Sequence, residues 1–122
     1  MQAYAFFTDV GEQEGLADLF TADAVWDGSS LGYGTAVGPQ AIAEAVGGHI
    51  NVDQPMMHMP GPALLVAIDD DVVHGVSWCT ATRWRDGATR PVIYFYYDDV
   101  FQRTADDTWR FRRRRLQAAF PS

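Results

Sequence analysis

The hydrophobic pattern of the chain changes its period near residue 50, and this change limits the folds open to it. Apolar residues at positions 3, 6, 7 and 10 recur at helical spacing. Beyond residue 60 the chain is instead rich in β-branched and aromatic residues, which favour strands. Helices followed by consecutive strands predict an α+β fold, in which an antiparallel sheet curves strongly over the helices.

Three short helices are expected before residue 50. The first has its apolar stripe on Ala3, Phe6, Phe7 and Val10 and is interrupted at Gly11. A second carries an apolar stripe at residues 16–20, and a third begins at Pro39 and stops at residues 47–48. Between them, residues 24–26 are typical of a short strand and residues 28–38, rich in glycine and serine, of a loop.

Four strands are expected in the second half, over residues 63–68, 72–84, 92–102 and 109–116. Two of them exceed ten residues, whereas strands usually have about five or six. Such a sheet must bend, at a β-bulge or at Gly75. A bent sheet closed at one end by helices forms a cone with an internal pocket, and that pocket is where we expect the function to lie.

The length and net charge of the chain limit its number of domains and the classes of molecule that it can bind. With 122 residues the chain is expected to be one domain over residues 1–122. Its net charge of −7 disfavours nucleic acid and anionic membranes, and the arginine run at 112–115 is divided between two faces if it lies in a strand. All nine cationic residues are arginine, so no lysine can form a Schiff base. Small neutral or modestly charged molecules remain as substrates or ligands.

The cellular context is inferred from what the sequence contains. It shows no signal peptide and no apolar run near the roughly 20 residues of a membrane span. Its one cysteine, Cys79, has no partner for an intramolecular disulfide and lies in a predicted strand, where it would act as a small apolar residue. We therefore expect a soluble, cytoplasmic protein.

Three residues could move protons without a metal or cofactor. His58 lies in the apolar run 56–60, where desolvation disfavours the imidazolium, so it is either a neutral base or a core histidine bonded to a backbone carbonyl. Asp9 and Tyr4 are five positions apart on the first helix and would flank its apolar stripe from opposite edges. Both could border one cavity; alternatively, Asp9 lies in solvent and Tyr4 is a core aromatic.

Two adjacent carboxylates suggest a buried ion pair. Asp98 and Asp99 lie on one predicted strand, so their side chains point to opposite faces and one of them points inward. A buried carboxylate needs a cation, and we expect Asp99 to pair with Arg113 or Arg114. The pair is either structural or the polar end of the pocket. His49 and His74 do not combine with His58 at a metal-ligand spacing, so we expect no metal and no cofactor.

Six motifs in order carry a resemblance to a known family. They are Tyr4-x4-Asp9, Leu19-Phe20-x2-Asp23-Ala24-Val25-Trp26, Gly38-x3-Ile42, Met57-His58-Met59, Asp99-x-Phe101-x-Arg103 and Trp109-Arg110-Phe111-x2-Arg114-Arg115-Leu116. Together they span nearly the whole chain. They resemble the SnoaL-like branch of the nuclear transport factor 2-like superfamily, which implies a cone-shaped α+β barrel of the cystatin-like type.

Within that superfamily, the nearest catalytic likeness is to scytalone dehydratase and the bile acid 7α-dehydratases. The resemblance implies that Asp9 and His58 form an acid-base pair beside Tyr4. Two departures are visible: residues 80–83 offer none of the histidine or aspartate that these enzymes add there, and a pocket tyrosine of scytalone dehydratase falls near Gly28. For the pocket wall we expect Trp26, Trp78, Tyr97, Asp99 and Arg114.

Two functions follow. The first is a cofactor-independent dehydratase, isomerase or cyclase acting on a small hydrophobic ring such as a polyketide or steroid-like compound, with His58 as base, Asp9 orienting it and Tyr4 stabilising an oxyanion. The second is a non-catalytic module that binds a small ligand or dimerises. An exposed sheet face rich in tyrosine and tryptophan would favour self-association, so we expect a homo-oligomer, most simply a dimer.

Overall fold

The structure of the chain is a computed structural model that describes residues 2–47, 56–85 and 87–120. Within these residues it holds three α-helices, one short 3-10 turn and one six-stranded sheet. The helices are α1 (Gln2–Val10), α2 (Gln13–Asp18) and α3 (Pro39–Gly47), and the turn is η1 (Ser29–Leu31). The strands are β1 (Phe20–Asp27), β2 (Thr35–Val37), β3 (Met56–Ala67), β4 (Val72–Arg85), β5 (Ala88–Arg103) and β6 (Trp109–Ala118).

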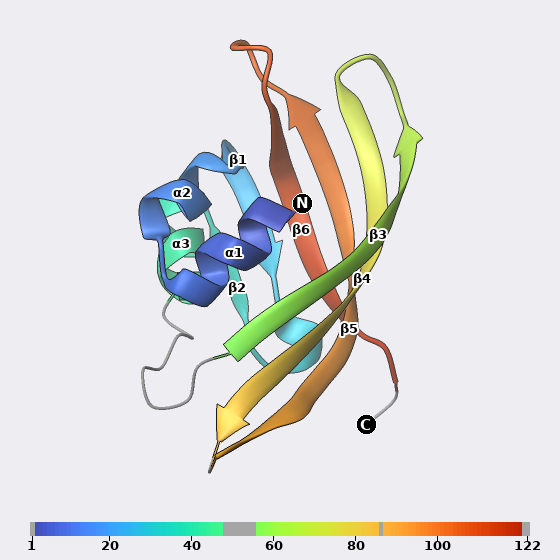
Figure 1. The fold of residues 1–122 in the computed structure, drawn as a ribbon. Helices are drawn as coiled ribbons and strands as arrows, with labels where there is room; N and C mark the ends of the chain where they lie inside the picture. The colour runs from blue at the N-terminus through green and yellow to red at the C-terminus, as the bar shows by residue number, and fades with distance from the viewer. Residues whose placement is uncertain (1, 48–55, 86, 121–122) are drawn as a thin grey trace.

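The helices lie together on one side of a curved sheet, and α1 lies between β3 and the other two helices (Figure 1). The strand order is β2-β1-β6-β5-β4-β3, so β2 and β3 are the sheet's edges. The predicted α+β fold with a strongly curved sheet is confirmed. The sheet is not closed, however, and the predicted barrel stays open between its two edge strands.

The sheet differs from the predicted antiparallel meander at its first strands. β1 is longer than residues 24–26 and pairs with β6 in parallel, with Trp26 opposite Arg114. The predicted loop at 28–38 contains β2, which pairs with the end of β1. The prediction missed β2 because a strand of three residues between glycines carries almost no periodic signal. It missed the pairing of β1 with β6 because the sequence pattern of a strand does not indicate a partner that is distant along the chain.

The face of α1 that is buried is not the predicted one. Phe6 and Val10, which belong to the predicted stripe, are 61% and 56% exposed, whereas Tyr4 and Thr8 are buried. Polar groups can occupy this face because each finds a partner. The Thr8 hydroxyl donates to the Tyr4 carbonyl (2.7 Å), and the Tyr4 hydroxyl accepts from Trp26 Nε1 (3.0 Å). The helix therefore turns its phenol, rather than its phenylalanines, toward the sheet.

β-Bulges allow the long strands to bend. The pairing register shifts between Pro60 and Ala63 on β3, and between Val100 and Phe101 on β5. These shifts confirm the expectation of a bulge, since an extra residue on one strand increases local bend and twist. Gly75 has a packing role, because an added Cβ would lie 2.8 Å from a Leu65 methyl group. β3 begins at Met56 instead of residue 63, so His58 is a strand residue.

The core fills the concave side of the sheet. It joins aromatic residues of the strands to apolar residues of the helices, and its large members are Tyr4, Leu16, Phe20, Trp26, Ile42, Val46, Phe95, Tyr97, Phe101, Phe111 and Leu116. Strand alternation places every second residue of β3 to β6 on the opposite, convex face. None of the helices in the described part of the chain has the length and apolarity needed to cross a bilayer.

Candidate active site

Asp9 and His58 meet across the gap between the end of α1 and the start of β3. Asp9 Oδ1 lies 2.6 Å from His58 Nδ1, and the Asp9 carboxylate also accepts the backbone N–H of His58 at 2.9 Å through Oδ2. The carboxylate therefore fixes both the backbone and the ring of the histidine. Both side chains are largely buried, with 20% and 14% of their surfaces exposed. Nε2 is the ring nitrogen that this contact leaves available.

His58 faces a small cavity on the concave side of the sheet. The cavity has a volume of about 80 Å³. At roughly 30 Å³ for each water molecule, it accommodates two or three waters or the edge of a ring. Its lining residues are Tyr4, Thr8, Trp26, Tyr33, Val46, Met56, His58, Arg83, Tyr97 and Leu116. The wall is thus mainly apolar, and the imidazole, Arg83 and the hydroxyl-bearing Thr8 are among its polar members.

Tyr4 lines this cavity and carries a neutral hydroxyl. Complete burial raises the pKa of the phenol to about 12, and the neighbouring Arg114 guanidinium opposes that rise only in part. Because the oxygen already accepts a hydrogen bond from Trp26 Nε1, its own hydrogen can be donated. Among the described residues no acceptor takes that hydrogen. The hydrogen of the Tyr4 hydroxyl is therefore available for donation to a further acceptor.

The Asp99 and Arg114 side chains form a buried ion pair, and the sequence-based choice between Arg113 and Arg114 is settled in favour of Arg114. Arg114 Nε lies 3.1 Å from Asp99 Oδ1. The guanidinium also stacks over three rings, closest to Tyr97 at 3.3 Å from the ring centroid. Burial raises the pKa of the Asp99 carboxyl to about 6, although Arg114 pulls it down. Desolvation thus exceeds the attraction within the pair.

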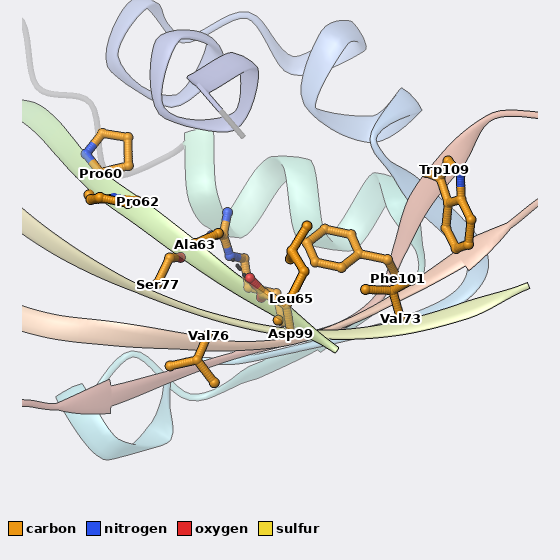
Figure 2. A pocket seen from close by; sticks show the side chains of 13 residues that line it. Pro60, Pro62, Ala63, Leu65, Val73, Val76, Ser77, Asp99, Phe101 and Trp109 are labelled. Atoms are coloured by element: carbon orange, nitrogen blue, oxygen red, sulfur yellow. Dashed lines mark ion pairs between the residues drawn. The ribbon is translucent and has the colours of Figure 1, made fainter. Parts of the chain in front are cut away.

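A second and larger cavity of about 750 Å³ lies on the same side of the sheet, beside Asp99 and Arg114 (Figure 2). Its wall includes Pro60, Ala63, Leu65, Phe101 and Trp109, and it shares no lining residue with the first cavity. The Arg114 guanidinium stacks on Tyr4 and Tyr97, which line the small cavity. The pocket residues predicted as one group are therefore divided between two cavities.

Trp78 lines neither of these cavities, contrary to the prediction. Its side chain is 59% exposed and packs edge-on against Tyr96 on the convex face. Strand alternation explains the error: the buried Cys79 next to it takes the inward position. Asp98 lies on the same convex face, where it contacts His74 at 2.7 Å and Arg115 at 2.6 Å.

A family model for the SnoaL-like domain matches residues 1–115 of the chain. The chain belongs to the SnoaL-like domain family. None of the curated proteins compared with it matches. This SnoaL-like domain is 24% identical to an NTF2-like protein with a cystatin-like fold from Novosphingobium aromaticivorans, over 98% of this chain and 77% of that chain, with a TM-score of 0.85.

Two further solved structures have the same fold. A provisionally named scytalone dehydratase from Novosphingobium aromaticivorans is 21% identical over 96% of this chain and 77% of its own, with a TM-score of 0.77. ActVI-ORFA from Streptomyces coelicolor is 19% identical over 94% of this chain and 88% of its own, with a TM-score of 0.82. At these identities the similarity establishes the NTF2-like, cystatin-like fold of this SnoaL-like domain and no particular reaction.

Several lining residues of this SnoaL-like domain are not apparent from the sequence. Thr8, Met56 and Arg83 border the His58 cavity, yet none belongs to a recognisable motif. Register supplies the missing signal: His58 pairs with Ala81 and Met56 with Arg83, which sets Arg83 two residues beyond the partner of His58. Only the pairing of β3 with β4, not composition, could have identified it.

The remaining reactive groups of the SnoaL-like domain do not join the site. Burial raises the pKa of the Cys79 thiol, which therefore stays protonated as expected for a packed cysteine. Within residues 2–47, 56–85 and 87–120, no three histidine, cysteine, aspartate or glutamate side chains are grouped as metal ligands would be. His49 lies outside the described residues, as does Gly48 at the expected end of the third helix.

Proposed function

We propose that this SnoaL-like domain is a cofactor-independent acid-base enzyme that removes a proton next to a carbonyl group in a small hydrophobic ring compound. The observation that carries the proposal is the 2.6 Å contact between Asp9 Oδ1 and His58 Nδ1 at the edge of a mainly apolar cavity. A carboxylate in this position favours the tautomer with hydrogen on Nδ1, which leaves Nε2 as a base.

The proposed step uses three side chains. His58 Nε2 takes the proton as the C–H bond breaks, and the electron pair of that bond moves onto the carbonyl oxygen as an enolate. The Tyr4 hydroxyl donates to that oxygen, and Asp9 stabilises the imidazolium. Because the cavity holds only about 80 Å³, the reacting edge of the ring enters it while the rest of the substrate extends through the opening. Dehydration, isomerisation and cyclisation can each begin with this step.

The name of one relative supports the choice of reaction class. That relative bears the provisional name of a scytalone dehydratase, and a dehydratase eliminates water. The direct contact of His58 with Asp9 suits the proton removal with which an elimination can begin. We therefore place dehydration first among the three reactions, with a polyketide-like or steroid-like ring as the substrate class.

Replacing Asp9 with asparagine tests the proposal. We expect wild-type protein to accelerate the exchange of α-hydrogens of cyclohexanone and 2-tetralone in heavy water, followed by proton NMR. Asp9→Asn should slow this exchange by about 10²-fold, because the amide no longer favours the productive tautomer or stabilises the imidazolium. Asp23→Asn removes a carboxylate that accepts a hydrogen bond from the Thr21 hydroxyl and does not line the His58 cavity, so it should have no effect. Equal rates in wild type and Asp9→Asn would refute the role of the carboxylate.

The alternative is a non-catalytic module that binds a ligand in the same fold. It retains the apolar cavity and gives the contact between Asp9 and His58 a structural role, since Asp9 also holds the His58 backbone N–H. The exchange assay separates the two functions. Wild-type protein that binds either ketone yet does not accelerate its exchange would favour the alternative.

We also propose that two copies of the chain associate through the convex face of the sheet. Apolar side chains on this face are more than 45% exposed over three neighbouring strands: Met57, Met59, Leu64, Val66, Trp78 and Tyr94. A continuous exposed apolar surface of this kind is usually an interaction site. The symmetric contact of one such face with a second copy would cover it in both chains.

Replacing Trp78 with glutamate should dissociate this dimer. Tryptophan is among the residues whose loss weakens interfaces most, by at least about 2 kcal/mol at energetically important positions. Light scattering should give twice the chain mass of 13.5 kDa for wild type and the single mass for Trp78→Glu. Phe6→Glu places the same charge on exposed α1 and should remain dimeric. A wild-type mass of 13.5 kDa would exclude the dimer.

A further inference from the structure

We propose that Arg83 binds the substrate oxygen that becomes negative, and that it selects planar ring compounds able to form an enolate or phenolate. This inference rests on the proposed function, since it names the group that would receive the charge released when His58 removes a proton. No motif or family resemblance assigned Arg83 to the site.

Register places Arg83 beside the acid-base pair. Arg83 of β4 is opposite Met56 of β3, and His58 is opposite Ala81. Arg83 and His58 are therefore diagonal neighbours on the same face, at roughly 7–8 Å. Both line the small cavity. A carbon facing His58 Nε2 and its adjacent carbonyl oxygen could thus be held between the imidazole and the guanidinium.

Arg83 also differs from most arginines of the described chain because no carboxylate lies beside its guanidinium. Arg103, Arg110, Arg113, Arg114 and Arg115 each lie within 4 Å of an aspartate, and Arg112 donates to Gln102. Among the residues that the structure describes, Arg83 has neither a hydrogen-bond nor an ion-pair partner, although it is half-buried and lines a cavity. A guanidinium has five N–H donors, and leaving them without acceptors at a partly desolvated position is costly.

The charges around the cavity agree with a ligand oxyanion. With a neutral imidazole, the Asp9 carboxylate and the Arg83 guanidinium balance each other. Transfer of a proton to His58 creates an imidazolium beside Asp9 and an enolate on the substrate. Arg83 then faces the enolate, so each charge has an opposite partner and the cavity remains neutral. Tyr4 adds a second donor that stays un-ionised, because burial keeps its pKa at about 12.

The test uses 4-nitrophenol, a planar compound whose phenolate resembles an enolate and absorbs visible light. Binding to wild-type protein should lower the pKa of the bound phenol by about one unit or more, as an opposite charge within hydrogen-bonding distance does. Arg83→Met keeps the aliphatic stem and removes the charge. It should weaken phenolate binding about tenfold or more and restore the pKa of the phenol. The affinity for nitrobenzene should change less than about twofold, because this neutral ligand carries no charge that could pair with the guanidinium.

Two further variants serve as controls. Arg112→Met removes a guanidinium whose partner is Gln102, outside both cavities, and should bind phenolate like wild type. Arg83→Lys retains a cation and should keep most of the phenolate preference, which also provides a folded variant if methionine is not tolerated. Equal losses of phenolate and nitrobenzene binding in Arg83→Met, or a wild type without preference for phenolate, would overturn the inference.

The role of Arg83 and the acid-base role of His58 can be tested independently of each other. His58→Gln leaves Arg83 in place, so it should bind phenolate while losing α-hydrogen exchange. If His58→Gln retains exchange while phenolate binding still depends on Arg83, the acid-base role of His58 is wrong and the binding role of Arg83 stands. If exchange depends on His58 but Arg83→Met binds phenolate like wild type, the acid-base role stands and Arg83 is not the oxyanion site.

Discussion

Replacing Arg114 with methionine should destabilise the folded protein by about 3–5 kcal/mol at pH 8, because it leaves the buried Asp99 carboxylate without its cation. Arg114 is 1% and Asp99 2% exposed, so water cannot replace the lost partner. The guanidinium also stacks on Tyr4, Tyr97 and Phe111, and methionine recovers only part of that contact. Urea unfolding followed by circular dichroism measures the change.

The destabilisation caused by Arg114→Met should become smaller as the pH falls. The pKa of Asp99 in the folded protein is about 6, above its ordinary value of 3.8, so the folded state holds this proton more tightly than the unfolded chain. Protonation of Asp99 therefore stabilises the fold fully below about pH 3.8, and this contribution is lost as the pH rises through 6. Near pH 4 Arg114→Met lacks only the stacking, whereas at pH 8 it also carries an unpaired carboxylate.

A double variant isolates the charge effect. Asp99→Asn with Arg114→Met removes both charges and should recover much of the stability lost at pH 8. Arg112→Met is the matched control, because that arginine is exposed and, within the described part of the chain, donates to Gln102 instead of a carboxylate. A destabilisation by Arg114→Met that is the same at pH 4 and pH 8 would show that ionised Asp99 does not depend on Arg114.

Replacing His58 with glutamine should reduce the α-hydrogen exchange rate by about 10²- to 10⁴-fold, the usual contribution of one general base. Glutamine keeps a similar size and a hydrogen-bonding group but cannot accept the proton. The backbone contact between His58 and Asp9 does not depend on the imidazole, so the fold should persist. Exchange rates and circular dichroism spectra measured on the same samples check both expectations.

The protein offers its own control for this variant. His74 also contacts a carboxylate, with its Nε2 2.7 Å from Asp98 Oδ1, but it lies on the convex face and lines neither cavity. His74→Gln should therefore leave the exchange rate unchanged. If His58→Gln and His74→Gln have the same small effect, a histidine beside an aspartate is not sufficient evidence for catalysis in this fold.

Sequence predicts the parts of this fold that have a strong local pattern. Pro39 and Gly47 mark the ends of α3, and the aspartate-rich turns separate the long strands. Residue spacing did not identify the pair of Asp9 and His58, which are 49 positions apart. The family resemblance singled out both residues, and the structure brings them into contact. The opposite faces of Asp98 and Asp99 followed directly from strand alternation.

The remaining features depend on tertiary contacts that leave no local signal. Hydrophobicity alone predicts that α1 buries Phe6, whereas the chain buries Tyr4 because Trp26 supplies a hydrogen bond to its hydroxyl. Trp78 is apolar enough for a pocket, yet the register of β4 directs it outward. The parallel pairing of β1 with β6 and the division of the interior into two cavities also depend on how distant segments pack.

Nitrogen-15 NMR of the two histidine rings provides the most direct measurement, because it reports which nitrogen carries the hydrogen. In the neutral rings we expect His58 to hold its hydrogen on Nδ1, toward Asp9, and His74 to hold its hydrogen on Nε2, toward Asp98. The bare His58 Nε2 signal should shift when 4-nitrophenol is added. A His58 ring with hydrogen on Nε2 and a bare Nδ1 would contradict the proposed proton transfer.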